Sequence, residues 1–283
     1  MIVDDLAERG NAGPRVLVVD LERLIGVLKP RRAWHPRDAK YTNYYRDGDW
    51  ARWPSTLTAS WQWLGEKRIH FAGSWEGEGK HTHVRDDGPN CVACREHMAA
   101  VTWSLYDEAD IVVTFNGRKA DNAWCFDDWA ETGLMRPKPW KDADLYVAAR
   151  QRFDFEYKSL AHLCKRLGIP GKTDKYDPER AENAYMGDPK AQAYLKRYNG
   201  GDIVATREAL RRLQGFVRFP GLNWSVFFGD EAFRCSHCGH DQLDPDGWSA
   251  KAQNQYAQYR CRACGGLTDT TSRKSHSRAR PVG

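Results

Sequence analysis

The stretch RVLVVDLE, residues 15–22, decides the fold. Its four apolar residues, Val16 to Val19, are typical of a strand that is buried on both faces at the centre of an α/β sheet. Side chains alternate along a strand, so Asp20 and Glu22 should point the same way. Two neighbouring carboxylates repel each other, and a divalent cation would offset that repulsion. The alternative is a solvated acidic turn, which this stretch taken alone favours.

A second buried strand is predicted at residues 110–115, DIVVTF, and a polar turn follows it. Within that turn Gly117 allows a tight connection into a helix that runs to about Gly133, and Asp121 lies near its start. An acid in that position is often a helix cap or a partner of the helix dipole. Metal ligation and helix capping therefore both remain open for Asp121.

The other stretches predict a hairpin and a series of helices. Residues 56–64 and 67–73 alternate around a Gly-Glu turn, and residues 24–28 are predicted as the antiparallel neighbour of the first strand. Asp202 follows two glycines, between two predicted helices. The helices are predicted over residues 96–108, 143–153, 158–167, 177–186, 189–198 and 203–215.

Length and charge restrict the class of protein. A chain of 283 residues is too long for one small core, so we expect a main domain with an appendage. No apolar run approaches the length of a membrane span, and the acidic N-terminus has no apolar signal core. We therefore expect a soluble, cytoplasmic protein without a membrane partner. A net charge of +5 implies no strong overall attraction to nucleic acid.

Charge is uneven along the chain. No acid follows Asp269, and residues 273–283 form a basic tail that either contacts phosphates or only keeps the chain soluble. Residues 30–54 interleave tryptophan and tyrosine with arginine and lysine. Such a segment either stacks unpaired bases between its cations or is a surface insertion over one end of the core.

Six of the eight cysteines form three C-x-x-C pairs, which favour metal binding over disulfides in an intracellular chain. Two of the pairs repeat C-x-x-C-G, and four thiolates there would close a tetrahedron around one structural zinc ion. Metal binding worth about 10–16 kcal/mol can replace the small core of so short a segment. These zinc ligands are Cys235, Cys238, Cys261 and Cys264.

The third pair, Cys91 and Cys94, follows a glycine-rich loop that carries His81 and His83. The four residues could form a zinc site of two histidines and two cysteines. The sequence does not determine where this loop folds, so the site stays open. The remaining two cysteines, Cys125 and Cys164, lie on apolar helical faces and are predicted core residues.

Taken together, these stretches resemble the DEDDy group of 3′–5′ exonucleases in the ribonuclease H-like superfamily, above all the stand-alone bacteriophage members that end in a zinc ribbon. The resemblance covers most of the chain, and it depends on the order and spacing of several weak motifs. They are VVDLE at 18–22, WQWLGEKRIHFAGSWE at 61–76, DEADIVVTFNGRKAD at 107–121, DLYVAARQRFDF at 144–155, LAHLCKRLGIPGKTD at 160–174, YNGGDIVATREAL at 198–210 and the cysteine pairs.

The resemblance implies a ribonuclease H-like α/β fold, with a mixed β-sheet flanked by helices, and a two-metal active site. Two Mg²⁺ or Mn²⁺ ions would be held by the carboxylates of Asp20, Glu22, Asp121 and Asp202. Tyr198 would orient the attacking water rather than act as a free base, because its ordinary pKa is near 10. Asn116 would contact substrate or stabilise the turn before Asp121.

The chain departs from the family pattern at three places. Arg23 stands where a small hydroxyl residue is usual, so it either contacts phosphate or competes with metal. Ala120 replaces an aromatic residue before Asp121. Two glycines lie between Tyr198 and Asp202, where they cost about 2 kcal/mol of helix propensity together.

The sequence as a whole predicts a lead-in (1–14), an exonuclease domain (15–222), a zinc ribbon (223–272) and a basic tail. The predicted activity is hydrolysis at single-stranded DNA 3′ ends, in a bacterial or phage-infected cytoplasm, with a replication or repair protein as a further partner. One alternative is a nucleic-acid-binding protein with an inactive nuclease core. Another is an RNA-trimming or structure-specific nuclease of the same fold.

Overall fold

The computed structural model describes residues 13–28, 50–83, 90–156, 159–169, 175–251 and 254–274. The lead-in up to residue 12, most of the aromatic and basic segment at 30–54, and the tail from residue 275 lie outside these residues. None of the helices described there combines the length and the apolar character needed to cross a bilayer.

The centre of the fold is a five-stranded mixed sheet with the strand order β5-β4-β1-β6-β7. The predicted central strand is β1, Val16–Leu24, and the second buried strand is β6, Ile111–Thr114, which runs parallel to it. The predicted hairpin is confirmed as β4 (Ser55–Trp63) and β5 (His70–Gly73), which pair antiparallel. These elements confirm the mixed sheet flanked by helices.

Two details of the predicted sheet were wrong. The antiparallel neighbour of β1 is β4, whereas residues 27–28 form a separate short strand, β2, that pairs with β3 (Trp50–Arg52). The helix predicted from residue 143 begins only at Leu145, because Lys141–Asp144 form the edge strand β7. So short a polar strand has no apolar periodicity that would predict it from the sequence. Its pairing with β6 identifies it.

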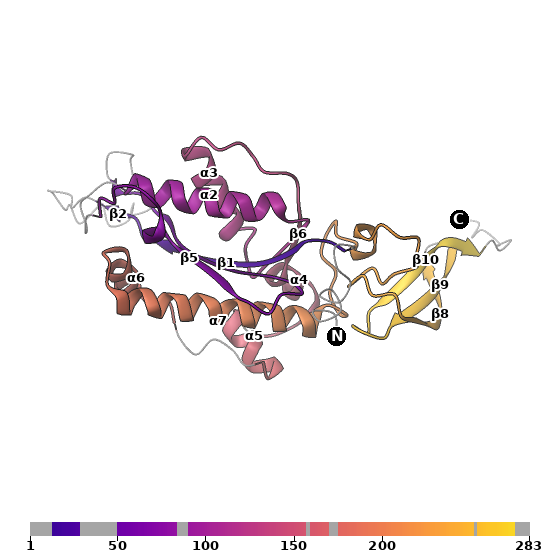
Figure 1. Ribbon diagram of the computed structural model, residues 1–283. Coiled ribbons are helices and arrows are strands. Elements are labelled where there is room, and N and C mark those ends of the chain that lie inside the picture. Colours follow the sequence, from indigo (N-terminus) through magenta and orange to yellow (C-terminus); the bar gives the residue numbers. More distant parts are fainter. Residues whose placement is uncertain are drawn as a thin grey trace, which may run out of the picture.

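Alternation along β1 divides the core into two layers. Val16 and Val18 join an apolar cluster with helices on one face, and Leu17, Val19 and Leu21 join a second cluster on the other. Figure 1 shows α2 and α3 on one side of the sheet and α7 and α5 on the opposite side. The helices are α2 (Val92–Glu108), α3 (Asp121–Glu131), α4 (Leu145–Arg152), α5 (Leu160–Leu167), α6 (Pro178–Tyr185) and α7 (Pro189–Leu213).

Local sequence accounts for where several helices begin. Asp144, Asp177 and Asp188 each cap the following helix by accepting backbone N–H groups with the side chain. Proline occupies the first turn of α6 and of α7, where its missing N–H has no helical partner to lose. The short 3₁₀ helices Ser74–Glu76 and Trp224–Phe227 complete the connections.

Helix α7 is continuous, so the prediction of two helices separated at Gly200 and Gly201 was wrong. Tertiary packing overrides the low helix propensity of the glycines, because one face of α7 is buried along its length against the sheet. The continuous helix gives Tyr198 and Asp202 an i, i+4 relation, which places both on the same helix face.

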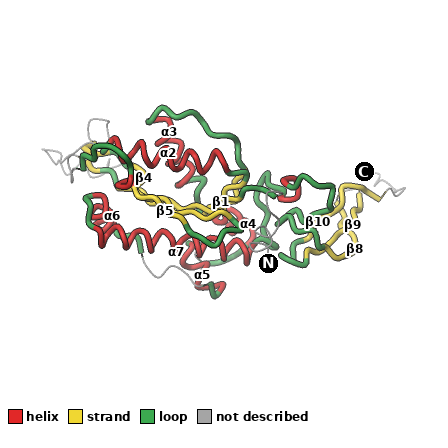
Figure 2. The backbone as a smooth tube through the Cα atoms, viewed as in Figure 1, coloured by secondary structure: helices red, strands yellow, loops and turns green. Residues whose placement is uncertain are grey.

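The C-terminal module is a three-stranded antiparallel sheet of β8 (Leu243–Lys251), β9 (Asn254–Cys261) and β10 (Leu267–Lys274). Figure 2 shows these strands at one end of the molecule, apart from the larger sheet. The ligand atoms of its four cysteines all lie within 4.8 Å of one another. This four-cysteine cluster is compatible with a zinc ribbon.

The module packs on the end of α7 through His237 and the backbone of Cys264. His237 is 8% exposed, its carbonyl accepts a 2.7 Å hydrogen bond from Gln214, and its Nδ1 lies 3.0 Å from the carbonyl of Val217. Gly215 is also close, because a Cβ there would lie 1.9 Å from the carbonyl oxygen of Cys264. A residue without a side chain is therefore needed at this contact.

Two glycine substitutions should change stability in opposite directions. Gly201→Ala should raise the free energy of unfolding by about 0.5–1 kcal/mol, because the new methyl group meets nothing within 4 Å inside a helix. Gly215→Ala should lower it by about 1–3 kcal/mol, because backbone must shift around Cys264. Urea denaturation measures both, and equal effects would contradict the described contact.

Candidate metal centre

Two carboxylates from β1 meet one from α7. Asp20 and Glu22 point to the sheet face that α7 covers, since they alternate with the residues of the opposite cluster. Asp202 is 2% exposed on α7. The ligand oxygens of the three acids lie within 4.8 Å of one another, which brings together residues 180 positions apart in the chain.

Asp121 reaches the same cavity from the start of α3. Its Oδ1 accepts a 2.8 Å hydrogen bond from the backbone N–H of Leu21. Leu21 lies on β1 beyond the residues that pair with β6. The pKa of Asp121 is raised to about 6, mainly by burial and also by the charges of Asp144 and Asp202, while backbone hydrogen bonds oppose the rise. Asp121 therefore belongs to a group of carboxylates that disfavour one another's charge.

The four acids line one cavity of about 790 Å³. None of the described residues that line it is a lysine or an arginine, so the lining offers no strong cation to balance the carboxylates. An anionic substrate would be repelled by such a surface unless metal cations were bound. The lining consists of Asp20, Leu21, Glu22, Phe115, Asn116, Ala120, Asp121, Trp124, Tyr146, Ser159, Leu160, His162 and Asp202.

Asn199 holds the first of these acids in place. Its amide nitrogen donates to the Asp20 carboxylate at 2.5 Å and to the Asp20 carbonyl at 3.1 Å. Its oxygen accepts from the hydroxyl of Thr58 on β4 at 3.2 Å. Asn199 is fully buried and thus connects α7 to two strands. No local pattern in the sequence marks Asn199, because it becomes a neighbour of Asp20 only after folding.

Asn116 forms the turn that precedes Asp121. It has a positive φ of 70°, a conformation that asparagine tolerates better than most residues. Its backbone N–H donates to Asp144 at 2.9 Å, and a Cβ on Gly117 would lie 2.3 Å from the Thr114 hydroxyl. Asn116 thus forms the turn before Asp121, and it is also one of the residues that line the cavity.

Tyr198 lies beside the acids but does not line the cavity. It is 5% exposed, and its ring is stacked 6.3 Å from Tyr194 and tilted 6.4 Å from Tyr176. Burial, the nearby charges of Glu22 and Asp202, and a hydrogen bond with Asp202 raise its pKa far above the ordinary value. The phenol therefore stays protonated at neutral pH and can donate a hydrogen bond but cannot act as a base.

Arg23 does not line the acidic cavity. A bulge separates it from Glu22, and its guanidinium donates to the carbonyl of Pro54 at 3.2 Å. The guanidinium also lies 3.7 Å from Asp127 and 5.5 Å from the centre of the Trp124 ring. The structure thus places Arg23 against α3, on the other face of the sheet, and not among the residues that line the cavity.

Several lining residues had no signal in the sequence. Ser159 caps α5, its side chain accepting from the N–H of His162, and both residues border the cavity. Three aromatic residues, Phe115, Trp124 and Tyr146, also border it. They come from different elements, so no local motif could have grouped them.

The carboxylates of the cavity and the four cysteines of the ribbon each fit the metal that their ligand chemistry predicts. Carboxylate oxygens suit small, hard divalent cations such as Mg²⁺ or Mn²⁺, whereas thiolates suit zinc. In the ribbon, the sulfur atoms of Cys235 and Cys264 are 3.6 Å apart, as are those of Cys238 and Cys261. Tetrahedral zinc holds two sulfur ligands about 3.8 Å apart, so the cluster matches a structural zinc site.

Comparison with models of protein families finds no match, and comparison with curated proteins finds none either. Among solved structures, the chain is similar to the family B DNA polymerase from the hyperthermophilic archaeon Pyrobaculum calidifontis, with a TM-score of 0.45 and 14% sequence identity. The match covers 71% of this chain and 24% of the polymerase chain. The matched part thus spans about a quarter of the length of that polymerase chain.

The raised pKa of Asp121 predicts a pH-dependent loss of stability. Without Mg²⁺ or Mn²⁺, the contribution of its carboxyl group is fully present near pH 4 and is lost as pH rises through about 6. Asp121→Asn keeps the acceptor for Leu21 and removes the charge. At pH 8 the variant should be more stable than wild type by about 1–3 kcal/mol.

At pH 4 the difference in unfolding free energy should largely disappear, which urea denaturation at both values measures. Added Mn²⁺ should stabilise wild type more than the variant. A difference that is the same at pH 4 and pH 8 would contradict the shifted pKa.

Proposed function

We propose that this protein is a metal-dependent nuclease, and more specifically a DEDDy-type 3′–5′ exonuclease that acts on single-stranded DNA ends. The observation that supports it is the convergence of four acids from β1, α3 and α7 on one cavity whose described lining has no lysine or arginine. The strand order, with β1 between antiparallel β4 and parallel β6, agrees with the ribonuclease H-like sheet that the resemblance implies.

In this proposal Asp20, Glu22, Asp121 and Asp202 hold two Mg²⁺ or Mn²⁺ ions. Two such ions supply an acidified water and stabilise charge on the entering and leaving oxygens of a phosphodiester. The protein's own contribution is to hold the ligands in place. Asn199 fixes Asp20, and the N–H of Leu21 fixes Asp121, so little reorganisation is needed when the site is filled.

Tyr198 would act as a positioning group for the attacking water. Its pKa is raised, so the hydroxyl keeps its proton and can donate or accept a hydrogen bond without taking a proton away. Because it is almost fully buried between two tyrosine rings, its orientation is restricted. Asp202 lies one helical turn further along α7, beside this hydroxyl.

The lining of the cavity agrees with an unpaired substrate. Phe115, Trp124 and Tyr146 give aromatic surface beside the acids, and aromatic rings bind unpaired bases by stacking. We assign the exonuclease unit to residues 15–222 and the zinc ribbon to residues 223–272. Asn116 would contact the terminal nucleotide from the turn that it forms.

Asp20→Asn and Asp202→Asn should each lower the rate of 3′-end digestion at least 100-fold, since each removes a charge that holds a metal ion. The assay uses a single-stranded oligonucleotide with Mg²⁺ or Mn²⁺. Asp128→Asn is the matched control, because Asp128 is another buried acid that accepts from the Thr56 hydroxyl away from the cavity. Full activity in either active-site variant would contradict the metal assignment.

A 5′-labelled single-stranded DNA should give a ladder that shortens from the 3′ end, and EDTA should stop it. The same reaction with RNA distinguishes an RNA-trimming enzyme from a DNA exonuclease. Circular single strands should remain uncut, since only an endonuclease cleaves them. Binding of the oligonucleotide without any metal-dependent cleavage would instead support a nucleic-acid-binding protein with an inactive core.

A further inference from the structure

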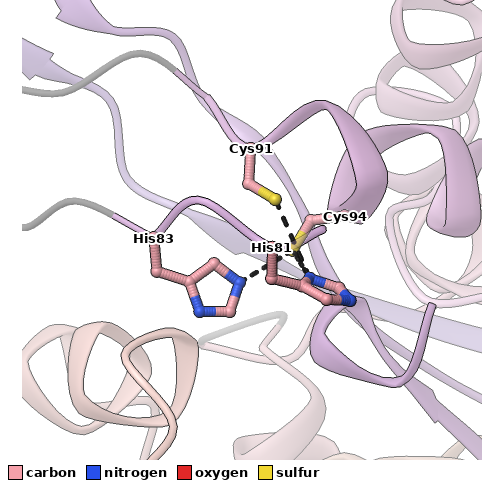
Figure 3. A group of neighbouring side chains, drawn as sticks. All are labelled: His81, His83, Cys91 and Cys94. Carbon is pink, nitrogen blue, oxygen red and sulfur yellow. Dashed lines mark hydrogen bonds between the residues drawn. The ribbon is translucent and has the colours of Figure 1, made fainter. Parts of the chain in front are cut away.

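A second group of metal-ligating side chains lies outside the acidic cavity. His81 and His83 come from the segment after β5, and Cys91 and Cys94 come from the start of α2. Figure 3 shows the two imidazole rings and the two sulfur atoms directed toward one another. The ligand atoms of all four lie within 4.8 Å of one another, and none of these residues lines the acidic cavity.

We propose that these four residues bind a zinc ion that is separate from the zinc of the ribbon. Tetrahedral zinc holds sulfur at about 2.3 Å and nitrogen at about 2.0–2.1 Å, so neighbouring ligand atoms lie about 3.3–3.8 Å apart. Here the Cys94 sulfur is 3.2 Å from Nδ1 of His81 and 3.1 Å from Nε2 of His83. The Cys91 sulfur is 3.8 Å from the same His81 nitrogen.

The hydrogen bonding of His81 prepares one nitrogen for a metal. Its Nε2 lies 2.7 Å from the carbonyl oxygen of Gly77, which can only accept, so Nε2 carries the proton. Nδ1 is then left with its lone pair toward the two sulfur atoms. A backbone carbonyl that fixes the tautomer in this way is a common second partner of zinc-bound histidine.

The backbone around the site is built for close approach. A Cβ on Gly77 would lie 2.6 Å from the Cβ of His97 on α2, so glycine lets this segment pass against the helix. Cys91 and Cys94 are 1% and 3% exposed in an apolar cluster with residues of α6. The N–H of Cys91 donates to the Tyr185 hydroxyl at 3.2 Å, and the His83 ring lies 4.4 Å from the Tyr185 ring.

The ion would therefore join three elements, namely the segment after β5, the start of α2 and, through Tyr185, the end of α6. With four protein ligands no coordination position is left open, so the zinc is structural. A C-x-x-C pair at a helix start also occurs in dithiol redox proteins. The two imidazole nitrogens placed against Cys94 favour a metal, because a redox pair needs no such ligands.

Zinc analysis of the purified full-length protein tests the proposal. Wild type should hold two zinc ions per chain, and Cys238→Ala in the ribbon should leave one. His83→Ala and Cys94→Ala should each also leave one. His97→Ala is the matched control, since His97 is a half-buried histidine of α2 beside the site but not among its ligands, and it should keep two.

His83→Cys replaces one zinc ligand with another, so it should fold and keep two zinc ions even if His83→Ala does not fold. With Co²⁺ in place of zinc, it should show one more thiolate charge-transfer contribution than wild type. A wild-type content of one zinc that Cys238→Ala abolishes would overturn the proposal. So would two zinc ions in folded His83→Ala, or a Cys91–Cys94 disulfide in the isolated protein.

Discussion

The main constraint on the candidate site is electrostatic, because folding brings together carboxylates that repel one another. Alternation along β1 turns Asp20 and Glu22 toward α7, where Asp202 is already buried. Asp121 comes from the opposite side of the sheet, and its pKa is raised by burial and by the charges of Asp144 and Asp202. Such an arrangement of like charges is unfavourable in the absence of cations.

Neutral groups hold the acids in position. The amide of Asn199 bonds to Asp20, and the N–H of Leu21 bonds to Asp121. Donors of this kind orient a carboxylate without neutralising it, so its negative charge stays available for a metal ion. Arg23 donates to the carbonyl of Pro54 and lies near Asp127 of α3, and it is not among the residues that line the acidic cavity.

Metal chemistry divides between two kinds of ligand in this chain. Carboxylates gather in the cavity at the end of β1, whereas thiolates gather in the ribbon and at the start of α2. The ribbon has a core of only a few buried residues, and it contacts the segment after α7 through His237 and the close approach at Gly215. A zinc ion bound by the four cysteines would supply there the stability that a small apolar core cannot.

Much of this organisation could be predicted from the sequence. The buried run at residues 16–19 predicted the central strand, because a strand buried on both faces favours a continuous run of apolar residues. The repeated C-x-x-C-G turns predicted the four-cysteine cluster, since each turn brings two sulfur atoms together locally. The helices α3, α5 and α6 were also found close to their observed bounds, because their caps and periodicity are local signals.

The sequence by itself determined which residue types were available and which face of β1 the acids share. Only the tertiary structure decided that α7 continues through two glycines, that Asn199 meets Asp20, and that Arg23 turns toward α3. It also decided that the loop with His81 and His83 folds back onto Cys91 and Cys94. The physical reason is that contacts between distant segments depend on packing, which a local pattern of residues does not contain.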